Sequence, residues 1–435
     1  MAKEELGFDT LKVRGGYNPH DHHNAASVPI YQTASYELGG TERVNRLFSF
    51  EELGFLYTRI GNPTVTVLEE RVAALDGAVA AVAVGSGMAA ITYTLLNVAE
   101  GGGRILTTPY LYGGTVDSFK KIYPQFGITF DQVANPNDLE SFRGAITPET
   151  KAIYVETISN PNATVADIEA LAILAHAHDI PLIVDNTVAT PYLLNPIRYG
   201  ADIVVYSATK ALGGHGNAIA GVIVESGKFN WDNGKFPHFS EPYHTLRDRQ
   251  GKPRNFLEVF PDAPFSFRVR LNYLAYFGAS LSPFDAYLIL QGIETLSERV
   301  QKQVSNTEKI IHYLETKTEV SWIKHPAARN SPYKTLAEKY LPKGAGSLFT
   351  FGFNGTDKQN STFIDAIKLF GYQANIGDSR SLIINSPKTT HGELTLEEQQ
   401  RADITSDTIR LSIGLEDAND LIADLEQAFG QAFAD

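Results

Sequence analysis

Short apolar runs alternate with helical patterns between residues 80 and 207, and this alternation most constrains the fold. The apolar runs are too short for helices, and the segments between them are long enough to hold one. Strands joined by helical crossovers form a mostly parallel sheet with helices on both faces. The sequence therefore predicts an α/β large domain. Its expected strands cover residues 80–84, 103–108, 151–156, 180–185 and 201–207.

The chain divides into three predicted segments. Residues 1–62 are rich in turn formers and predict an arm that contacts a neighbouring subunit. Residues 63–280 form the large domain, whose first helix is expected to begin after Asn62 and to stop at Gly77. Within it, the polar and aromatic stretch 226–266 predicts an inserted surface loop. Residues 281–435 predict a smaller α+β C-terminal domain.

Composition excludes several classes of function. A net charge of −13 argues against a nucleic-acid surface, which needs clustered lysine and arginine. The absence of cysteine excludes disulfides, thiolate catalysis and cysteine-based metal sites. Neither a signal-type start nor an apolar run of membrane-spanning length is visible, so we expect the cytoplasm. "PHDHHN" (19–24) could bind a divalent metal, but the solvated loop is the favoured interpretation, and we predict no metal site.

Chemically reactive residues follow four of the expected strands. "GSGMAA" (85–90) follows the first, Glu156 ends another, and Asp185 ends the next. The last strand leads into "SATK", which contains Lys210. Ligands of such sheets bind beyond the carboxyl ends of the strands. Taken singly, each motif has a plainer interpretation: a tight turn, a helix cap or a solvated surface lysine.

In combination, these motifs predict a pyridoxal 5′-phosphate site. The cofactor's aldehyde binds a lysine amine, its ring nitrogen pairs with a carboxylate, and its phosphate takes hydroxyl and amide donors. Lys210, Asp185, and Ser207 with Thr209 meet these needs. The glycine motif lacks the third glycine of a dinucleotide fingerprint and the ending of a P-loop, so those cofactors are disfavoured.

Motifs along nearly the whole chain resemble one family. They are "PIYQTASY" (29–36), "YTRIGNPT" (57–64), "LYGGT" (111–115), "ETISNP" (156–161), "IVDNTVATPY" (183–192), "ADIVVYSATKALGGHG" (201–216) and "RLSIG" (410–414). This order is similar to the Cys/Met-metabolism, cystathionine-gamma-synthase-like enzymes of pyridoxal-phosphate fold type I. The resemblance implies that fold, pyridoxal phosphate as cofactor, and a homotetramer built from dimers that share active sites.

The resemblance also implies a role for individual residues. Lys210 would form the Schiff base and move protons, and Asp185 would pair with the ring nitrogen beside Thr187. Tyr112 would stack on the ring, and Arg410 would grip the substrate carboxylate as a bidentate guanidinium. The remaining cofactor contacts would come from Gly87, Met88, Asn160, Ser207 and Thr209, and, reaching into the neighbouring subunit, from Tyr57 and Arg59.

Three segments are similar to the O-acetylhomoserine sulfhydrylase branch of this family: 226–237, 341–352 and 374–383. They imply γ-replacement in sulfur amino-acid metabolism and methionine biosynthesis: sulfide or methanethiol displaces acetate from O-acetyl-L-homoserine, giving L-homocysteine or methionine. Cystathionine or methionine gamma-lyase and cystathionine gamma-synthase activities are the alternatives. "YGGT" lacks the cysteine typical of methionine gamma-lyase after the tyrosine, which weakens that alternative. The chain departs from the family pattern at Ala211, Asn217, Asn385 and Lys388.

Overall fold

A seven-stranded sheet forms the centre of the computed structural model, which describes residues 6–392 and 394–434. Every strand runs parallel to its neighbours except β7, which is antiparallel to both of the strands beside it. The predicted α/β fold with a mostly parallel sheet is confirmed. In spatial order the strands are β1 (Ala80–Val84), β7 (Gly221–Glu225), β6 (Ile203–Ser207), β5 (Leu182–Asp185), β4 (Thr150–Glu156), β2 (Gly103–Thr107) and β3 (Ile128–Gln132).

Helices cover both faces of this sheet, because alternate strand residues point to opposite sides. Ala83 and Val204 belong to one buried core, whereas Val84 and Val205 belong to the other. The first core is covered by α3 (Pro63–Asp76), α7 (Ile168–His176), α8 (Thr190–Leu193) and α13 (Pro283–Glu294). The second is covered by α4 (Gly87–Val98), α5 (Gly113–Lys121), α11 (Pro264–Arg268) and α12 (Ala275–Phe277), with the π-helical turn Val269–Leu274 between the last two.

The first predicted helix has the expected ends. The side chain of Asn62 accepts a hydrogen bond from the Thr64 amide at 3.0 Å, which caps α3. At the other end Gly77 adopts a left-handed conformation with φ of 63°. The fully buried Asn62 also donates to the Tyr31 carbonyl and the Tyr36 hydroxyl, at 2.8 and 2.9 Å. It therefore fixes the preceding arm as well as the helix.

The segment 226–266 differs from the surface loop that its polar composition predicts. It contains α9 (Pro237–Ser240), α10 (Phe256–Val259) and a hairpin of β8 (Tyr243–Arg247) and β9 (Pro253–Arg254). Trp231, Phe236 and Phe239 are almost completely buried, and the Trp231 ring stacks on Phe265 with centroids 5.0 Å apart. Aromatic side chains between the polar residues supply enough apolar area to pack this segment onto the sheet.

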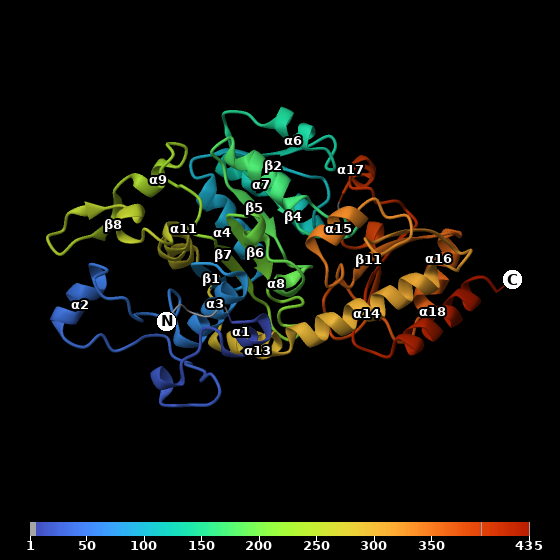
Figure 1. Ribbon diagram of the computed structural model, residues 1–435, viewed down its shortest axis with the longest axis horizontal. Helices are drawn as coiled ribbons and strands as arrows, with labels where there is room; N and C mark the ends of the chain where they lie inside the picture. The colour runs from blue at the N-terminus through green and yellow to red at the C-terminus, as the bar shows by residue number, and fades with distance from the viewer. Residues whose placement is uncertain (1–5, 393, 435) are drawn as a thin grey trace.

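A second sheet organises the C-terminal part of the chain, on the right of Figure 1. The long helix α14 (Leu296–Leu314) leads from the large sheet toward it and shares its core with α16 (Asp357–Ala366) and α18 (Ala418–Ala432). Its strands, in spatial order, are β10 (Val320–Lys324), β11 (Leu348–Phe353), β14 (Thr408–Ser412), β13 (Leu382–Asn385) and β12 (Gly371–Tyr372). The shorter helices elsewhere are α6 (Leu139–Ala145), α15 (Lys334–Tyr340) and α17 (Leu396–Arg401).

The arm is only partly extended. Its helix α1 (Phe8–Arg14) packs beside α3, where Arg71 donates to the Gly15 carbonyl at 2.9 Å. The helix α2 (Thr41–Phe48) projects from the body on the same side as the β8 hairpin (Figure 1). Arg249 of that hairpin segment pairs with Glu42 and Glu51. The arm residues Phe48, Leu53 and Tyr57 remain exposed.

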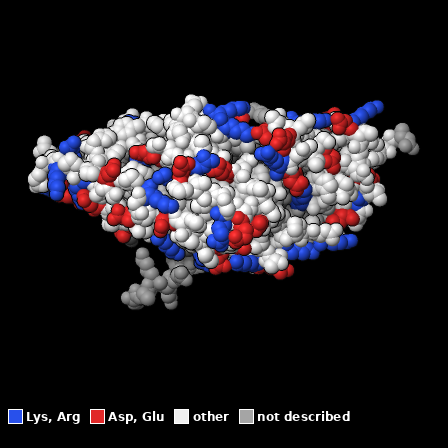
Figure 2. All heavy atoms as spheres, turned by 90° about the horizontal axis from the view of Figure 1, so that it is seen from above, with Lys and Arg blue, Asp and Glu red and all other residues white. Residues whose placement is uncertain are grey.

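Charged side chains of both signs are interspersed on the face seen in Figure 2, where neither sign forms a large continuous patch. Within residues 6–392 and 394–434, no helix combines the length and apolar character needed to cross a membrane.

Replacing Asn62 by alanine should destabilise the protein by about 2–4 kcal/mol, because α3 loses its cap and two partly buried groups of the arm lose their partner. The matched control is Asp417→Ala, which removes the cap of α18 at an exposed position with one hydrogen bond, to the Asn419 amide. We expect a loss of about 1 kcal/mol there. Urea unfolding midpoints measure both, and equal losses would contradict the arm-fixing role of Asn62.

Candidate functional site

A cavity of about 260 Å³ lies at the carboxyl ends of the parallel strands. Side chains from the C-terminal domain close its other side. Of the predicted site residues, Tyr57 and Arg59 lie outside it. Those that line the cavity are Gly87, Met88, Tyr112, Asn160, Asp185, Thr187, Ser207, Thr209, Lys210 and Arg410.

The floor of the cavity is built by a close approach between β6 and the start of α4. A Cβ on Gly87 would lie 2.6 Å from the Cβ of Ser207, so only glycine fits there. Ser86 caps α4 by accepting from the Ala89 amide at 3.1 Å. The other amides at this helix end and the Ser207 hydroxyl form a group of donors suited to a phosphate. Thr209 lines the same part of the cavity, and its hydroxyl donates to the Ala220 carbonyl at 3.2 Å.

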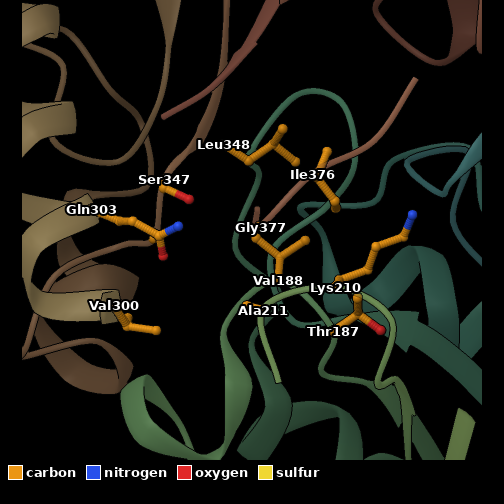
Figure 3. A pocket seen from close by; sticks show the side chains of 11 residues that line it. Thr187, Val188, Lys210, Ala211, Val300, Gln303, Ser347, Leu348, Ile376 and Gly377 are labelled. Carbon is orange, nitrogen blue, oxygen red and sulfur yellow. The ribbon is translucent and has the colours of Figure 1, made fainter. Parts of the chain in front are cut away.

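Lys210 extends into the cavity from the loop after β6. In Figure 3 its ammonium group points away from Val300 and Gln303 of α14. The nitrogen donates to the Asn375 side-chain oxygen at 2.6 Å. Burial lowers the pKa of Lys210, the charge of Arg410 lowers it further, and Asp378 opposes the shift. A larger fraction of neutral amine than on a surface lysine follows.

Arg410, on β14, is the most deeply buried cation of the cavity, with 3% of its surface exposed. Its guanidinium donates to the Asn160 side chain at 3.0 Å and to the Asn375 carbonyl at 3.2 Å. Burial lowers its pKa to about 10. No carboxylate in residues 6–392 or 394–434 forms an ion pair with it. A buried guanidinium without a counter-charge suits a carboxylate ligand.

Asp185 is held at the end of β5 by neutral donors. The Thr187 amide donates to one carboxylate oxygen at 2.9 Å, and the Tyr154 hydroxyl donates to the other at 3.3 Å. Thr187 in turn accepts from the Ser207 amide at 2.8 Å. Burial raises the pKa of Asp185. The Asp185 carboxylate is therefore able to bind a cationic group of a ligand.

Tyr112 stands at the rim, where 39% of its surface is exposed. A Cβ on Gly114 would lie 2.6 Å from the tyrosine ring, so the ring rests over that glycine. A Cβ on Gly113 would lie 2.2 Å from the Thr390 carbonyl oxygen. A cysteine at position 113 would clash with this carbonyl oxygen, which gives a physical reason why no cysteine follows Tyr112.

Comparison with known proteins assigns the chain to a family. Residues 9–430 match the model of the Cys/Met metabolism PLP-dependent enzymes. The chain belongs to this family. The predicted family and its cofactor, pyridoxal phosphate, are thereby confirmed.

Relatives with this architecture match over essentially their whole length. Sulfhydrylase FUB7 of Gibberella moniliformis is 43% identical over 440 residues, which is 100% of both chains. The O-acetyl-L-homoserine sulfhydrylase of Leptospira meyeri is 41% identical over 97% of this chain and 96% of that protein. A Campylobacter jejuni structure assigned as an O-acetylhomoserine (thiol)-lyase superposes with a TM-score of 0.93 at 38% identity, covering 98% of this chain and 100% of its own. That structure carries a pyridoxyl group on a lysine.

The residues present fit pyridoxal phosphate. Because Gly87 has no side chain beside Ser207, a phosphate has room to lie against the backbone there. The Asp185 carboxylate can accept a hydrogen bond from a ring nitrogen. Lys210 offers an amine with a lowered pKa inside the same cavity. These groups converge from different strands, as the sequence predicts.

Tyr57 and Arg59 lie together outside this cavity. The Arg59 guanidinium stacks over the Tyr57 ring, 5.4 Å from its centroid, and donates to the Ala275 carbonyl. Tyr57 is 45% exposed. Within one chain neither residue reaches the phosphate floor, so their predicted roles require a second subunit.

Two cavity residues escape the sequence-based set of site residues. Asn375 bonds both Lys210 and Arg410, yet it sits in a loop of the C-terminal domain that no local motif marks. The sequence places Glu156 at the end of an expected strand, but no chemical group of the cofactor requires a second carboxylate partner. The four departures from the family pattern all lie outside the large cavity. Of these, Ala211 lines a separate cavity of about 20 Å³ behind Lys210, large enough for about one water (Figure 3).

The histidines of "PHDHHN" make local contacts. His20 pairs with Asn24 at 2.8 Å and His22 with the Tyr31 hydroxyl at 3.0 Å. Among the residues that the structure describes, no group of three or more acidic or histidine side chains is arranged to hold a metal ion.

Gly87→Ala should weaken cofactor retention by about tenfold, because the new methyl group forces the start of α4 away from Ser207. The control is Gly144→Ala in α6, where an added Cβ meets no atom within 4 Å. Cofactor absorbance after dialysis against cofactor-free buffer measures retention. Equal retention in the two variants would contradict the proposed phosphate floor.

Proposed function

We propose that this protein is an O-acetylhomoserine sulfhydrylase, which replaces the acetyl group of O-acetyl-L-homoserine with sulfide. Homocysteine and acetate are the products, and methanethiol in place of sulfide gives methionine. The observation that supports the amino-acid assignment is the buried Arg410, which has no carboxylate partner among the described residues. It lies beside Lys210, and both side chains donate hydrogen bonds to Asn375. Full-length similarity to the sulfhydrylases narrows the reaction to γ-replacement.

The cofactor, when bound, supplies an aldehyde that condenses with amines and a ring that withdraws electrons from the substrate. The protein supplies binding, orientation and proton transfer. Arg410 binds the substrate α-carboxylate by charge-assisted hydrogen bonds, and Asn160 orients its guanidinium. This grip places the substrate amine and its Cα on the Lys210 side of the cavity.

Lys210 is the proton carrier in this proposal. Its lowered pKa keeps a neutral amine available to accept the proton from Cα, and the Asn375 side chain lies within hydrogen-bonding distance of the lysine nitrogen. In this proposal Lys210 also removes a proton from Cβ, which allows the γ-carbon to release acetate. After sulfide has added to the γ-carbon, protons return to Cβ and Cα. Overall one C–O bond is broken and one C–S bond is formed, with no net oxidation.

The remaining site residues hold the cofactor. Asp185 accepts a hydrogen bond from the ring nitrogen, and its ionised form is favoured once that cation is beside it. The amides at Gly87 and Met88, with Ser207 and Thr209, hold the phosphate. Tyr112 covers the ring from the rim.

A shared site between two subunits explains the exposed arm. Tyr57 and Arg59 would reach the phosphate of a partner, and the exposed Phe48 and Leu53 give the arm apolar surface to bury there. We propose a dimer that shares sites and assembles into a tetramer. As an enzyme of sulfur amino-acid metabolism, it would act in the cytoplasm.

Product analysis tests the reaction. Purified protein loaded with pyridoxal phosphate should convert O-acetyl-L-homoserine and sulfide into homocysteine and acetate in equal amounts. The succinyl and phosphoryl esters should react more slowly at equal concentration. Ammonia and an oxoacid formed without sulfide would instead favour the gamma-lyase alternative and overturn the proposal.

Arg59→Ala tests the shared site. We expect the variant to lose cofactor about tenfold faster than the wild-type protein, because a cation leaves the phosphate of the partner subunit. Arg143→Ala is the control, since Arg143 is half-exposed on α6 and pairs only with Glu140 among the described residues. Absorbance of the bound cofactor after dilution gives the rate, and light scattering gives the assembly. Unchanged retention, or full activity in a monomer, would refute sharing.

A further inference from the structure

Glu156 has no part in the mechanism above, although it lines the cavity at the carboxyl end of β4. Only 7% of its surface is exposed. Its Oε1 atom accepts a hydrogen bond from the Tyr112 amide at 2.7 Å, and its Oε2 atom accepts one from the Asn160 amide at 2.8 Å. Both oxygens of one buried carboxylate are therefore used on the backbone of two predicted site residues.

These two amides belong to different loops. Tyr112 precedes α5, in the connection after β2, where the helix packs Gly113 closely against the Thr390 carbonyl. Asn160 follows β4, and its side chain accepts from the Arg410 guanidinium at 3.0 Å. A single carboxylate thus joins the loop that carries the ring-covering tyrosine to the loop that orients the carboxylate-binding arginine.

Ionisation of a carboxyl group is energetically unfavourable at this position. Glu156 lies directly opposite Asp185 in the register of β4 and β5. Burial raises the pKa of Glu156 well above its usual range, the charge of Asp185 raises it further, and the two amide donors oppose the shift. A buried carboxyl group in a cavity with so strongly raised a pKa is a candidate for a functional role.

A glutamine could not replace this carboxylate. An ionised glutamate presents acceptors only, whereas an amide presents one oxygen acceptor and one donor group. At this position the amide nitrogen would face a backbone N–H, so one of the two loops would lose its anchor. The pattern of two amides bound by two oxygens is specific for a carboxylate.

We propose that Glu156 is a positioning residue that sets Tyr112 and Asn160 relative to each other, so that the ring cover and the substrate grip are placed together. This inference rests on the proposed function for the roles of those two residues. The anchoring itself is a property of the chain and can be measured without substrate.

The chain contains a matched control in Glu225. It ends β7, is 1% exposed, and accepts from two backbone amides, Phe265 at 3.2 Å and Ser266 at 2.7 Å. Because β7 runs antiparallel to its neighbours, this residue lies at the opposite edge of the sheet from the cavity. Glu225→Gln therefore removes the same kind of anchor without touching the site.

The experiment compares Glu156→Gln and Glu225→Gln by amide hydrogen exchange of the cofactor-loaded protein. We expect exchange at Tyr112 and Asn160 to be about tenfold faster in E156Q and unchanged in E225Q. The absorbance of the bound cofactor should shift only in E156Q, and the KM for O-acetyl-L-homoserine should rise about tenfold with a smaller change in kcat. Both variants should lower the melting temperature.

Two outcomes would overturn the proposal: unchanged exchange at both amides in E156Q, or the same exchange and spectral changes in E225Q. Glu156→Asp covers the case in which E156Q does not fold. Aspartate keeps the charge but is one methylene shorter, so it should bind one of the two amides and release the other. Wild-type exchange at both amides in this variant would also overturn the proposal. Hydrogen exchange and cofactor absorbance do not depend on the substrate, so they test the positioning role of Glu156 even if O-acetyl-L-homoserine is not turned over.

Discussion

The cavity holds two basic and two acidic side chains that form no ion pairs with one another in the described structure, and the rest of the site depends on that separation. Lys210 and Arg410 bond to asparagine groups. Asp185 and Glu156 bond to backbone amides and, for Asp185, a tyrosine hydroxyl. Ion pairs between them would cancel the charges that ligands need. Neutral partners instead satisfy part of each group's hydrogen-bonding capacity and leave each group able to interact with a ligand.

This separation follows from where the groups originate. The carboxylates come from β4 and β5, adjacent in the middle of the large sheet, whereas Arg410 comes from β14 of the C-terminal sheet. Lys210 enters the same cavity from the loop after β6. The cofactor would bring a ring nitrogen to Asp185, and the substrate would bring a carboxylate to Arg410. Each ligand would therefore supply a counter-charge as it binds.

Much of this arrangement could be predicted from the sequence, because the relevant signals are local. Asn62 and Gly77 mark the ends of α3, and the apolar runs mark five of the seven strands of the large sheet to within two residues. Strands β3 and β7 are not among those predicted from the sequence. Once the strands are parallel, their carboxyl ends must meet, so Asp185 and Lys210 are brought together by topology alone. The individual roles of the site residues remain predictions.

What could not be predicted depends on contacts between distant segments. Asn375 joins the site only because the C-terminal domain packs over the strand ends, and Glu156 finds its amides only after two loops have folded. The segment 226–266 has a turn-rich, polar composition, and its buried aromatic core becomes visible only in three dimensions. Periodicity and turn chemistry carry no information about such contacts.

The role of Lys210 as the cofactor-binding residue can be measured by mapping the modified lysine. Protein reconstituted with pyridoxal phosphate is reduced with borohydride, digested and analysed by mass spectrometry. We expect a phosphopyridoxyl group on the peptide that contains Lys210, and on no other peptide at one equivalent per chain. Modification of a different lysine, or none after saturation with the cofactor, would contradict this role.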